Sequence, residues 1–339
     1  MREITIGDVV IQPGTRSVVQ FPIASLYTHT QLSLPVHVIH GKTDGPCLFI
    51  SAAIHGDELN GVEIIRRLLK HKSLKNIKGS LIAIPIVNSF GLIQHSRYLP
   101  DRRDLNRSFP GSQRGPLASR LAYIFMETIV KQCTHGIDLH TGALHRNNLP
   151  QIRANLDDEE TKLLAQAFAV PVLINSNTRD GSLREAATEQ GLKMLLYEAG
   201  EALRFDELSI GAGLKGIIRV MRCLGMIKPS KRKENITEPF IARSSVWLRA
   251  PHGGVLRNLK KPGDHVVKDE LLGTISDPTD IFNATEHPVL ASRTGIVIGK
   301  TNLPLVNEGD ALYHIAFFED SFEVAQELET FQQDFELNE

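Results

Sequence analysis

The sequence predicts an α/β domain followed by a smaller all-β domain. In the region 45–225, short apolar runs that suit strands buried on both faces alternate with stretches of helical spacing. A charged stretch follows at 228–235, and beyond it short apolar runs are separated by Gly-Asp and Pro-Gly turns. The 339 residues also exceed what one typical small domain needs, so two domains are the expected number.

The predicted elements of the α/β domain follow one another along the chain. Residues 47–54 form a strand, and 81–87 form another, which Pro85 interrupts or bulges. The stretch 59–69 between them has helical spacing. Its solvent-facing side is predicted to consist of Glu63, Arg66, Arg67 and Lys70. Further helices are predicted at 117–130, 163–169 and 211–224, and further strands at 172–174 and 193–197.

The predicted all-β domain contains a weak internal repeat. Residues 250–256 align with 291–297, and each copy leads into an apolar strand, at 267–275 and at 306–315. Such a duplication predicts two interlocked halves of a small barrel sandwich, similar to the biotinyl and lipoyl carrier domains. Those carriers present a modified lysine between the halves, whereas 276–288 contain neither lysine nor methionine. We therefore expect a scaffold or a lid and not a carrier.

These patterns set the predicted domain boundaries. Residues 1–227 form the first domain, with β character over about its first 40 residues. Residues 228–243 form a linker, 244–320 the barrel sandwich and 321–339 a C-terminal tail.

Charge and cysteine content exclude several classes of protein. The 38 basic and 39 acidic residues give a net charge of −1, which offers no electrostatic case for binding nucleic acid or an anionic membrane. Three widely spaced cysteines form neither a disulfide framework nor a CxxC metal knuckle. The N-terminus lacks the apolar core of a signal peptide, and the apolar runs are far shorter than the roughly 20 residues of a membrane helix. We therefore expect a cytoplasmic protein without nucleic-acid or membrane partners.

Two motifs place metal-binding side chains where strands are predicted to end. His55-Gly56-Asp57-Glu58 follows the first strand, and Asp138-Leu139-His140-Thr141-Gly142 ends a later one. Two histidines and a glutamate bind Zn²⁺ and leave a fourth position open for water, so we predict one zinc ion on His55, Glu58 and His140. Gly56 is expected to allow a tight turn. The alternative makes both histidines ordinary polar residues at strand ends; the combination of HxxE with the distal motif favours the metal site.

Residues 97–111 form an arginine-rich loop. Four arginines lie between Arg97 and Arg107, and the prolines and glycine nearby fit neither an amphipathic helix nor a strand. Because the planar guanidinium fork matches a carboxylate, such a loop beside zinc suits an anionic substrate. From composition alone, a solvent-facing charged loop balanced by Asp101 and Asp104 is an equally good interpretation.

Four segments together resemble the succinylglutamate desuccinylase/aspartoacylase family of the zinc-carboxypeptidase-like superfamily. They are His55-Gly56-Asp57-Glu58, Asp104-Leu105-Asn106-Arg107, Asp138-Leu139-His140-Thr141-Gly142 and Tyr197-Glu198-Ala199-Gly200, and the resemblance covers at least 45–200. It implies a mixed, twisted sheet flanked by helices with an additional β-domain. It also implies one zinc ion per chain, and hydrolysis of an amide, or of an ester, in a small N-acyl amino acid or related amine.

The resemblance also assigns roles within the site. Glu198 matches the general base that takes the proton from zinc-bound water and passes it to the leaving nitrogen. Its position after an apolar run fits a partly buried carboxylate; the alternative is an acid at a helix start, with Glu201 as the rival base. Asn106 and Arg107 resemble the pair that binds the substrate carboxylate.

One arginine is expected to polarise the scissile carbonyl. Arg97 resembles that arginine, but it lies farther upstream of Asn106 than in aspartoacylase proper, so Arg102 and Arg103 are alternatives. Asp138 either orients a ligating histidine or only faces the edge of the core. His145 and Arg146 either contact an acyl carboxylate or are exposed.

Two other functions remain open on the sequence. A metallocarboxypeptidase that acts on peptides would use the same residues, and a narrow pocket closed by 240–320 would exclude it. A non-catalytic binding protein would use the β-domain and would hold no zinc.

Overall fold

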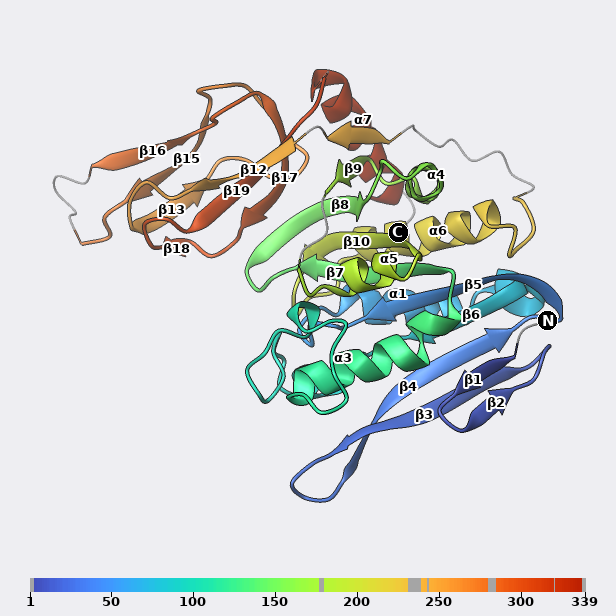
Figure 1. The fold of residues 1–339 in the computed structure, drawn as a ribbon. Helices are drawn as coiled ribbons and strands as arrows, with labels where there is room; N and C mark the ends of the chain where they lie inside the picture. The colour runs from blue at the N-terminus through green and yellow to red at the C-terminus, as the bar shows by residue number, and fades with distance from the viewer. Residues whose placement is uncertain are drawn as a thin grey trace.

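The structure is a computed structural model of the 339-residue chain and describes residues 3–176, 180–230, 239–242, 244–279, 285–319 and 321–336. Within them, a thirteen-stranded mixed sheet runs through the molecule with helices on both faces, and a four-stranded sheet lies in the C-terminal part (Figure 1). The predicted mixed α/β architecture is therefore confirmed. None of the helices in the described part of the chain is long and apolar enough to cross a membrane.

Four parallel strands occupy the middle of the large sheet. Their order is β6 (Lys78–Ile84), β5 (Thr43–Ala52), β7 (His135–Gly142) and β10 (Lys193–Glu201). Beyond β6 the sheet continues with β4 (Gln31–His40) and β3 (Arg16–Ser25), and beyond β10 with β8 (Arg146–Ala154), all by antiparallel pairing. Because parallel strands end at one edge of a sheet, the segments after β5, β7 and β10 meet there.

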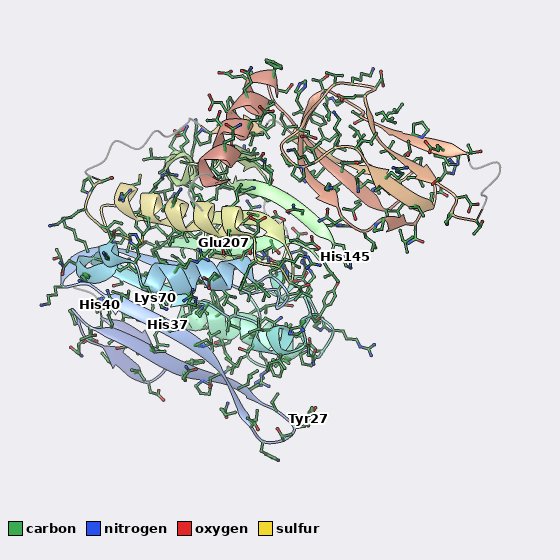
Figure 2. All side chains as sticks on the ribbon, turned by 180° about the vertical axis from the view of Figure 1, so that it is seen from behind. Tyr27, His37, His40, Lys70, His145 and Glu207 are labelled. Carbon is green, nitrogen blue, oxygen red and sulfur yellow. The ribbon has the colours of Figure 1, made fainter. Side chains whose placement is uncertain are left out.

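The helices cover the two faces of this sheet. α1 (Asn60–Leu69), α4 (Glu159–Phe168) and α6 (Glu207–Cys223) pack on one face. α3 (Leu117–Thr128) and α5 (Leu183–Glu189) pack on the other, together with residues of the small hairpin β1 (Ile4–Ile6) and β2 (Val9–Ile11). Figure 2 shows α6 alongside α1, with Glu207 and Lys70 on the outer side of these two helices.

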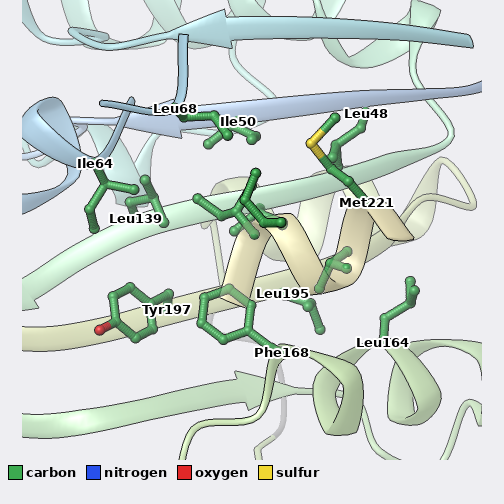
Figure 3. Packing of buried hydrophobic residues seen from close by; sticks show 14 of the residues in the cluster. Leu48, Ile50, Ile64, Leu68, Leu139, Leu164, Phe168, Leu195, Tyr197 and Met221 are labelled. Carbon is green, nitrogen blue, oxygen red and sulfur yellow. The ribbon is translucent and has the colours of Figure 1, made fainter. Parts of the chain in front are cut away.

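The core under α1, α4 and α6 is closely packed (Figure 3). The Tyr197 ring stacks on Phe168 with 5.1 Å between centroids, and its hydroxyl donates to the Ser209 carbonyl at 2.7 Å. Burial raises the pKa of Tyr197 well above its ordinary value, so the hydroxyl stays a donor. Gly216 is required here because a Cβ on it would lie 2.1 Å from the Phe168 ring.

The C-terminal strands interlock in the way that the repeat predicts. The first half contains β13 (Gly254–Asn258), β14 (His265–Val266) and β15 (Leu271–Ser276); the second contains β17 (Gly295–Thr301), β18 (Leu305–Val306) and β19 (Ala311–Phe317). β14 pairs with β17, and β18 pairs with β13, so each half completes the other. β16 (Glu286–Leu290) lies beside β15, and β12 (Ser244–Arg249) beside β19.

The C-terminal part is continuous with the large sheet. β17 pairs with β8 through Gly299 opposite Asn148, so backbone hydrogen bonds join the two parts of the chain. Within the segment predicted as a linker, Phe240–Ala242 form β11, which pairs with β9 (Val172–Asn175). Residues 231–238 and 243 of that segment lie outside the described residues.

Several elements differ from the sequence prediction for identifiable reasons. β8 was missed because Pro150 and a row of polar residues disrupt its apolar pattern. The predicted C-terminal tail contains α7 (Ser321–Glu336). Within 321–333, where burial is described, α7 buries only Val324 and Leu328, so its apolar stripe is weak. β6 ends at Ile84, so Pro85 terminates the strand and does not bulge it.

Glu63 was predicted on the solvent-facing side of α1, and this was wrong. The side chain is buried, and its carboxylate accepts bonds from Arg66 Nε at 2.5 Å and Arg67 Nε at 2.7 Å. Arg67 also reaches Glu207 at the start of α6, with Nη1 2.7 Å from Oε2. The hydrogen bond from Arg66, together with Arg67, lowers the pKa of Glu63 to about 2. Arg67 thus connects the charged side of α1 to α6, whereas Arg66 and Lys70 are exposed, as predicted.

Two of the three cysteines meet in the fold. Cys47 and Cys133 are 86 positions apart in the chain, yet their sulfurs lie 3.5 Å apart in the core. Cys223 is exposed, and the three cysteines are not joined by disulfide bonds in the described part of the chain.

Replacement of Glu63 by glutamine tests this contact. The free energy of unfolding is expected to fall by about 2 kcal/mol at neutral pH, the size typical of bonds to charged groups. Because the pKa of Glu63 is about 2 in the folded protein against an ordinary 4.5, its contribution is complete above pH 4.5 and disappears as the pH falls toward 2. Urea titrations of the two proteins at several pH values measure the difference. A difference that does not change below pH 4.5 would contradict the assignment.

The matched control is Glu127→Gln. Glu127 pairs with Lys131 one turn away on an exposed surface, so its loss is expected to cost less than about 1 kcal/mol.

Candidate metal centre

Three buried side chains converge at the edge where β5 and β7 end. His55 lies three residues after β5, Glu58 just before α1, and His140 inside β7. Sequence analysis had placed the His140 motif at the end of a strand; His140 lies within β7, two residues before its end. Both histidines direct Nδ1 at Glu58, at 2.7 Å from Oε1 for His55 and 2.8 Å from Oε2 for His140. One ligand atom from each residue lies within 4.8 Å of the other two, so the three could hold one metal ion.

Close packing beneath the loop explains Gly56. Its φ is not in the left-handed region, so the predicted turn does not require glycine. A Cβ at this position would lie 2.0 Å from the Gly91 carbonyl carbon at α2 (Ser89–Ile93). Glycine therefore lets the loop that carries His55 and Glu58 lie directly on the backbone of α2.

Carboxylates hold the other nitrogen of each histidine. His140 Nε2 lies 2.7 Å from Asp138 Oδ2, and Asp138 Oδ1 accepts from the Ser51 hydroxyl at 2.7 Å. His55 Nε2 lies 3.1 Å from Asp104 Oδ1. With its Nε2–H directed at a carboxylate, each ring presents Nδ1 to the centre, an arrangement typical of metal-binding histidines. The donor set therefore fits a metal ion such as Zn²⁺.

The electrostatics of the centre are dominated by opposite charges in a buried place. Burial lowers the pKa of His140, but Asp138 and Glu58 outweigh it and hold the pKa well above its ordinary value. Burial likewise raises the pKa of Glu58, but the two histidines outweigh it and keep the pKa far below the usual range. The Glu58 carboxylate is therefore ionised, as a metal ligand must be.

A cavity of about 480 Å³ opens at this centre. Five arginines line it, and the acidic residues that line it are Glu58, which belongs to the centre itself, and Glu198 on β10. The arginines are Arg97, Arg107, Arg146, Arg153 and Arg184. Such a lining favours a ligand with negative charge.

Glu198 lies opposite His140 in the pairing of β10 with β7. Its Oε1 accepts from Asn148 Nδ2 at 2.9 Å, and its Oε2 lies 2.6 Å from Arg153 Nε. Both neighbours fix the carboxylate on the wall of the cavity. The rival Glu201 does not line the cavity; its Oε2 accepts from Asn302 at 2.7 Å.

Some residues of the arginine-rich loop line the cavity and others do not. Arg97 donates from Nη2 to Asp104 at 2.9 Å and lies 3.4 Å from Glu58 Oε1 through Nη1. Arg102 and Arg103 are exposed and are not among the residues that line the cavity. Asn106 and Arg107 both line it.

Sequence analysis missed several residues of the site. Asp104 stood in a recognised motif but received no role, although it contacts both His55 and Arg97. Asn148 and Arg153 lie on the missed strand β8, and Trp247 lies far along the chain on β12. His145 is exposed at the end of β8 that faces the C-terminal strands (Figure 2), whereas its neighbour Arg146 lines the cavity.

Comparison with known proteins identifies a family and a relative to which this chain is similar. The family model of the succinylglutamate desuccinylase/aspartoacylase catalytic domain matches residues 44–224. N-alpha-acetyl-L-2,4-diaminobutyric acid deacetylase of Halomonas elongata is 25% identical over 295 residues, which are 84% of this chain and 85% of that protein.

Solved structures share the fold along nearly the whole chain. A succinylglutamate desuccinylase/aspartoacylase from Rhodobacter sphaeroides has a TM-score of 0.79 at 23% identity, covering 90% of this chain and 95% of its own. The product-bound ectoine utilization protein EutE from Ruegeria pomeroyi has a TM-score of 0.78 at 23% identity, with coverages of 89% and 94%. With the family model matching more than half of its length, the chain belongs to the succinylglutamate desuccinylase/aspartoacylase family.

Proposed function

We propose that this protein is a zinc-dependent hydrolase that removes the acyl group from a small N-acyl amino acid or a related amine. The observation that carries the proposal is the His55, Glu58 and His140 triad in an arginine-lined cavity, which Glu198, paired opposite His140 on the next strand, also lines. The Halomonas relative is named as a deacetylase of an N-acetylated amino acid, which supports the same bond type here.

His55 and His140 would hold zinc through Nδ1, and Glu58 through its carboxylate. Bound zinc lowers the pKa of a water molecule to about 7 and polarises a carbonyl. Asp138 and Asp104 fix the two imidazoles through Nε2, so their part is to keep both Nδ1 atoms aimed at the ion.

Glu198 is the proposed general base. It accepts the proton of the attacking water and then donates it to the amide nitrogen, which leaves as an amine. Asn148 and Arg153 hold the carboxylate in place through one oxygen each. Arg97, anchored by Asp104 beside Glu58, would donate to the carbonyl oxygen as negative charge develops on it.

Asn106 and Arg107 are the proposed binding pair for the carboxylate of the amino acid. Asn106 Oδ1 accepts from the Leu183 amide at 2.9 Å, which orients its side chain. Arg107 donates from Nη1 to the backbone carbonyl of Asn106, which holds its guanidinium beside that residue. An anionic amino acid therefore fits this cavity better than a cationic one.

The size of the cavity favours a small substrate over a peptide. Trp247, which lies in the segment 240–320 whose closure of the pocket would exclude peptides, lines the cavity and contacts Arg146 through its ring. We further propose that the protein acts in the cytoplasm, because its three cysteines, odd in number and widely spaced, do not form a disulfide framework.

Zinc binding is tested by removing one ligand. His140→Ala is expected to abolish binding of about one zinc per chain, because the two remaining ligands do not complete the site. Asp138→Asn is expected to weaken zinc binding by about 10- to 100-fold with the fold unchanged, because Asp138 only orients His140. Elemental analysis after dialysis against zinc gives the stoichiometry. His252→Ala, exposed in the C-terminal part, is the control and should keep the metal. Full zinc content in His140→Ala would refute the assignment.

The base is tested by Glu198→Gln. This variant should retain zinc but lose about 100- to 10,000-fold in kcat on N-acyl amino acids, since the amide cannot accept the proton. Glu201→Gln is the matched control and should stay within a few-fold of the wild type, because Glu201 does not line the cavity. Equal losses in both variants would remove Glu198 from its proposed role.

The carbonyl-polarising arginine is tested by Arg97→Ala against Arg103→Ala. Loss of one donor to a developing oxyanion costs about 100- to 1,000-fold in kcat. That loss is expected for Arg97, whereas Arg103, whose side chain is 60% exposed, should have almost no effect. Steady-state kinetics on one N-acyl amino acid decide between them, and the opposite order of effects would transfer the role to Arg103.

A further inference from the structure

The side chain of Gln151 is fully buried and makes no hydrogen bond to any described residue. Its exposed fraction is 0%, and neither Oε1 nor Nε2 has a partner in the described part of the chain. A buried amide without partners destabilises a folded protein, so most buried amides are bonded. Gln132 shows the usual arrangement, because its side chain accepts from Thr5 N–H at 2.9 Å and donates to the Thr5 carbonyl at 2.7 Å. The stability of the fold therefore does not explain Gln151.

The strand pairing places Gln151 beside the proposed general base. Gln151 lies on β8 opposite Glu198 on β10, and Arg153 lies two residues farther along β8, opposite Leu196. Directly paired residues project on the same face of a sheet with about 5 Å between their Cβ atoms, and residues two apart in a strand share a face. A glutamine side chain is long enough to span such a distance. The amide of Gln151 is therefore within reach of both Glu198 and Arg153.

Other polar groups of β8 around Glu198 also have unused hydrogen-bonding capacity. Arg153 Nε lies 2.6 Å from Glu198 Oε2 but is without a hydrogen bond of good geometry among the described residues. Asn148 donates from Nδ2 to Glu198, whereas its Oδ1 has no partner in the described part and lies beside Gly299, where a Cβ would be 2.5 Å away. The unused groups thus gather on the strand that supports the base.

The neighbours of Glu198 suit only one of the two states that it adopts in the proposed reaction. The ionised carboxylate accepts hydrogen bonds, and Asn148 Nδ2 and the Arg153 guanidinium are donors. Once Glu198 has taken the proton of the attacking water, it is neutral, and Arg153 loses its anionic partner. The Arg153 side chain is only 17% exposed, so its charge then needs another acceptor. Gln151 Oε1 is an acceptor within reach that no described residue uses.

We propose that Gln151 is a positioning residue, which holds Arg153, and through it Glu198, while Glu198 carries the proton. Gln151 is not among the described residues that line the cavity, so it acts on the reaction through these two side chains. The proposal rests on the proposed function, because it assumes that Glu198 is the general base. It explains by a role in catalysis an amide that the stability of the fold does not require.

Gln151→Met tests the proposal, since methionine removes the amide and keeps the length of the side chain. The urea midpoint is expected to stay unchanged or to rise, because no hydrogen bond to a described residue is lost. Zinc content should stay at about one per chain. The kcat on an N-acyl amino acid should fall about ten-fold, with KM changed less than about three-fold. A midpoint that falls together with kcat, or a kcat equal to that of the wild type, would overturn the proposal.

Gln132→Met is the matched control. It removes an amide whose bonds to Thr5 tie the β1 strand to the segment after α3, so the urea midpoint should fall. Because Gln132 does not line the cavity, kcat should stay within a few-fold of the wild type. The two substitutions are thus expected to affect stability and catalysis in opposite ways.

A double substitution tests whether Gln151 acts through Arg153. Arg153→Met is expected to lower kcat by itself, because Glu198 loses one of its two holders. Adding Gln151→Met to that variant should change kcat less than about two-fold, since no guanidinium is left to hold. Losses that multiply in the double variant would show that Gln151 acts independently of Arg153 and would refute the proposal.

Glu198→Gln separates the failure of this proposal from the failure of the proposed function. A large loss of kcat in Glu198→Gln with none in Gln151→Met would refute the positioning role and keep the proposed base. An unchanged kcat in Glu198→Gln would remove Glu198 from its proposed role, and the positioning role would be refuted with it. Steady-state kinetics of the zinc-loaded variants on the same N-acyl amino acid decide between these results.

Discussion

The site depends on one buried charge, the carboxylate of Glu58. An isolated ionised carboxylate in such a place would be strongly unfavourable, so its oxygens must be compensated. Each oxygen lies beside the Nδ1 of a histidine, and Thr141 N–H donates to one of them at 3.1 Å. His55 after β5, Glu58 before α1 and His140 in β7 therefore meet at one point, where they could hold a metal ion.

The supporting carboxylates extend this arrangement outward. Asp138 ties His140 to Ser51 on the neighbouring strand, and Asp104 ties His55 to Arg97. The positions of the imidazoles are thus set by buried groups of the sheet and by the arginine-rich loop. The loop contributes to the geometry of the centre as well as to the charge of the cavity.

The C-terminal strands are part of the site because the sheet is continuous. β17 pairs with β8, and β8 carries Asn148 and Arg153, which contact Glu198. If the C-terminal strands formed a separate domain, the position of their cavity-lining residues would depend on a flexible contact between domains. Backbone hydrogen bonds between the two parts fix that wall in register with the proposed base.

Sequence analysis predicted the parts of the site that follow from local spacing and resemblance. His55 and Glu58 are three residues apart, and the strand-end position of each motif follows from the parallel sheet. The burial of Glu63 was not predictable from periodicity, because Arg67, which donates to Glu63, also contacts Glu207 on α6, and that surface is remote in sequence. Strand β8 was missed since its cavity-facing residues are polar, and Trp247 because its place depends on long-range strand register.

X-ray absorption at the zinc edge of the zinc-loaded protein tests the central claim most directly. Coordination by His55 and His140 with Glu58 and one water predicts four nitrogen or oxygen atoms at about 2.0–2.2 Å, with two imidazole rings in the scattering. Sulfur at about 2.3 Å, or a shell without imidazole, would contradict the proposed centre.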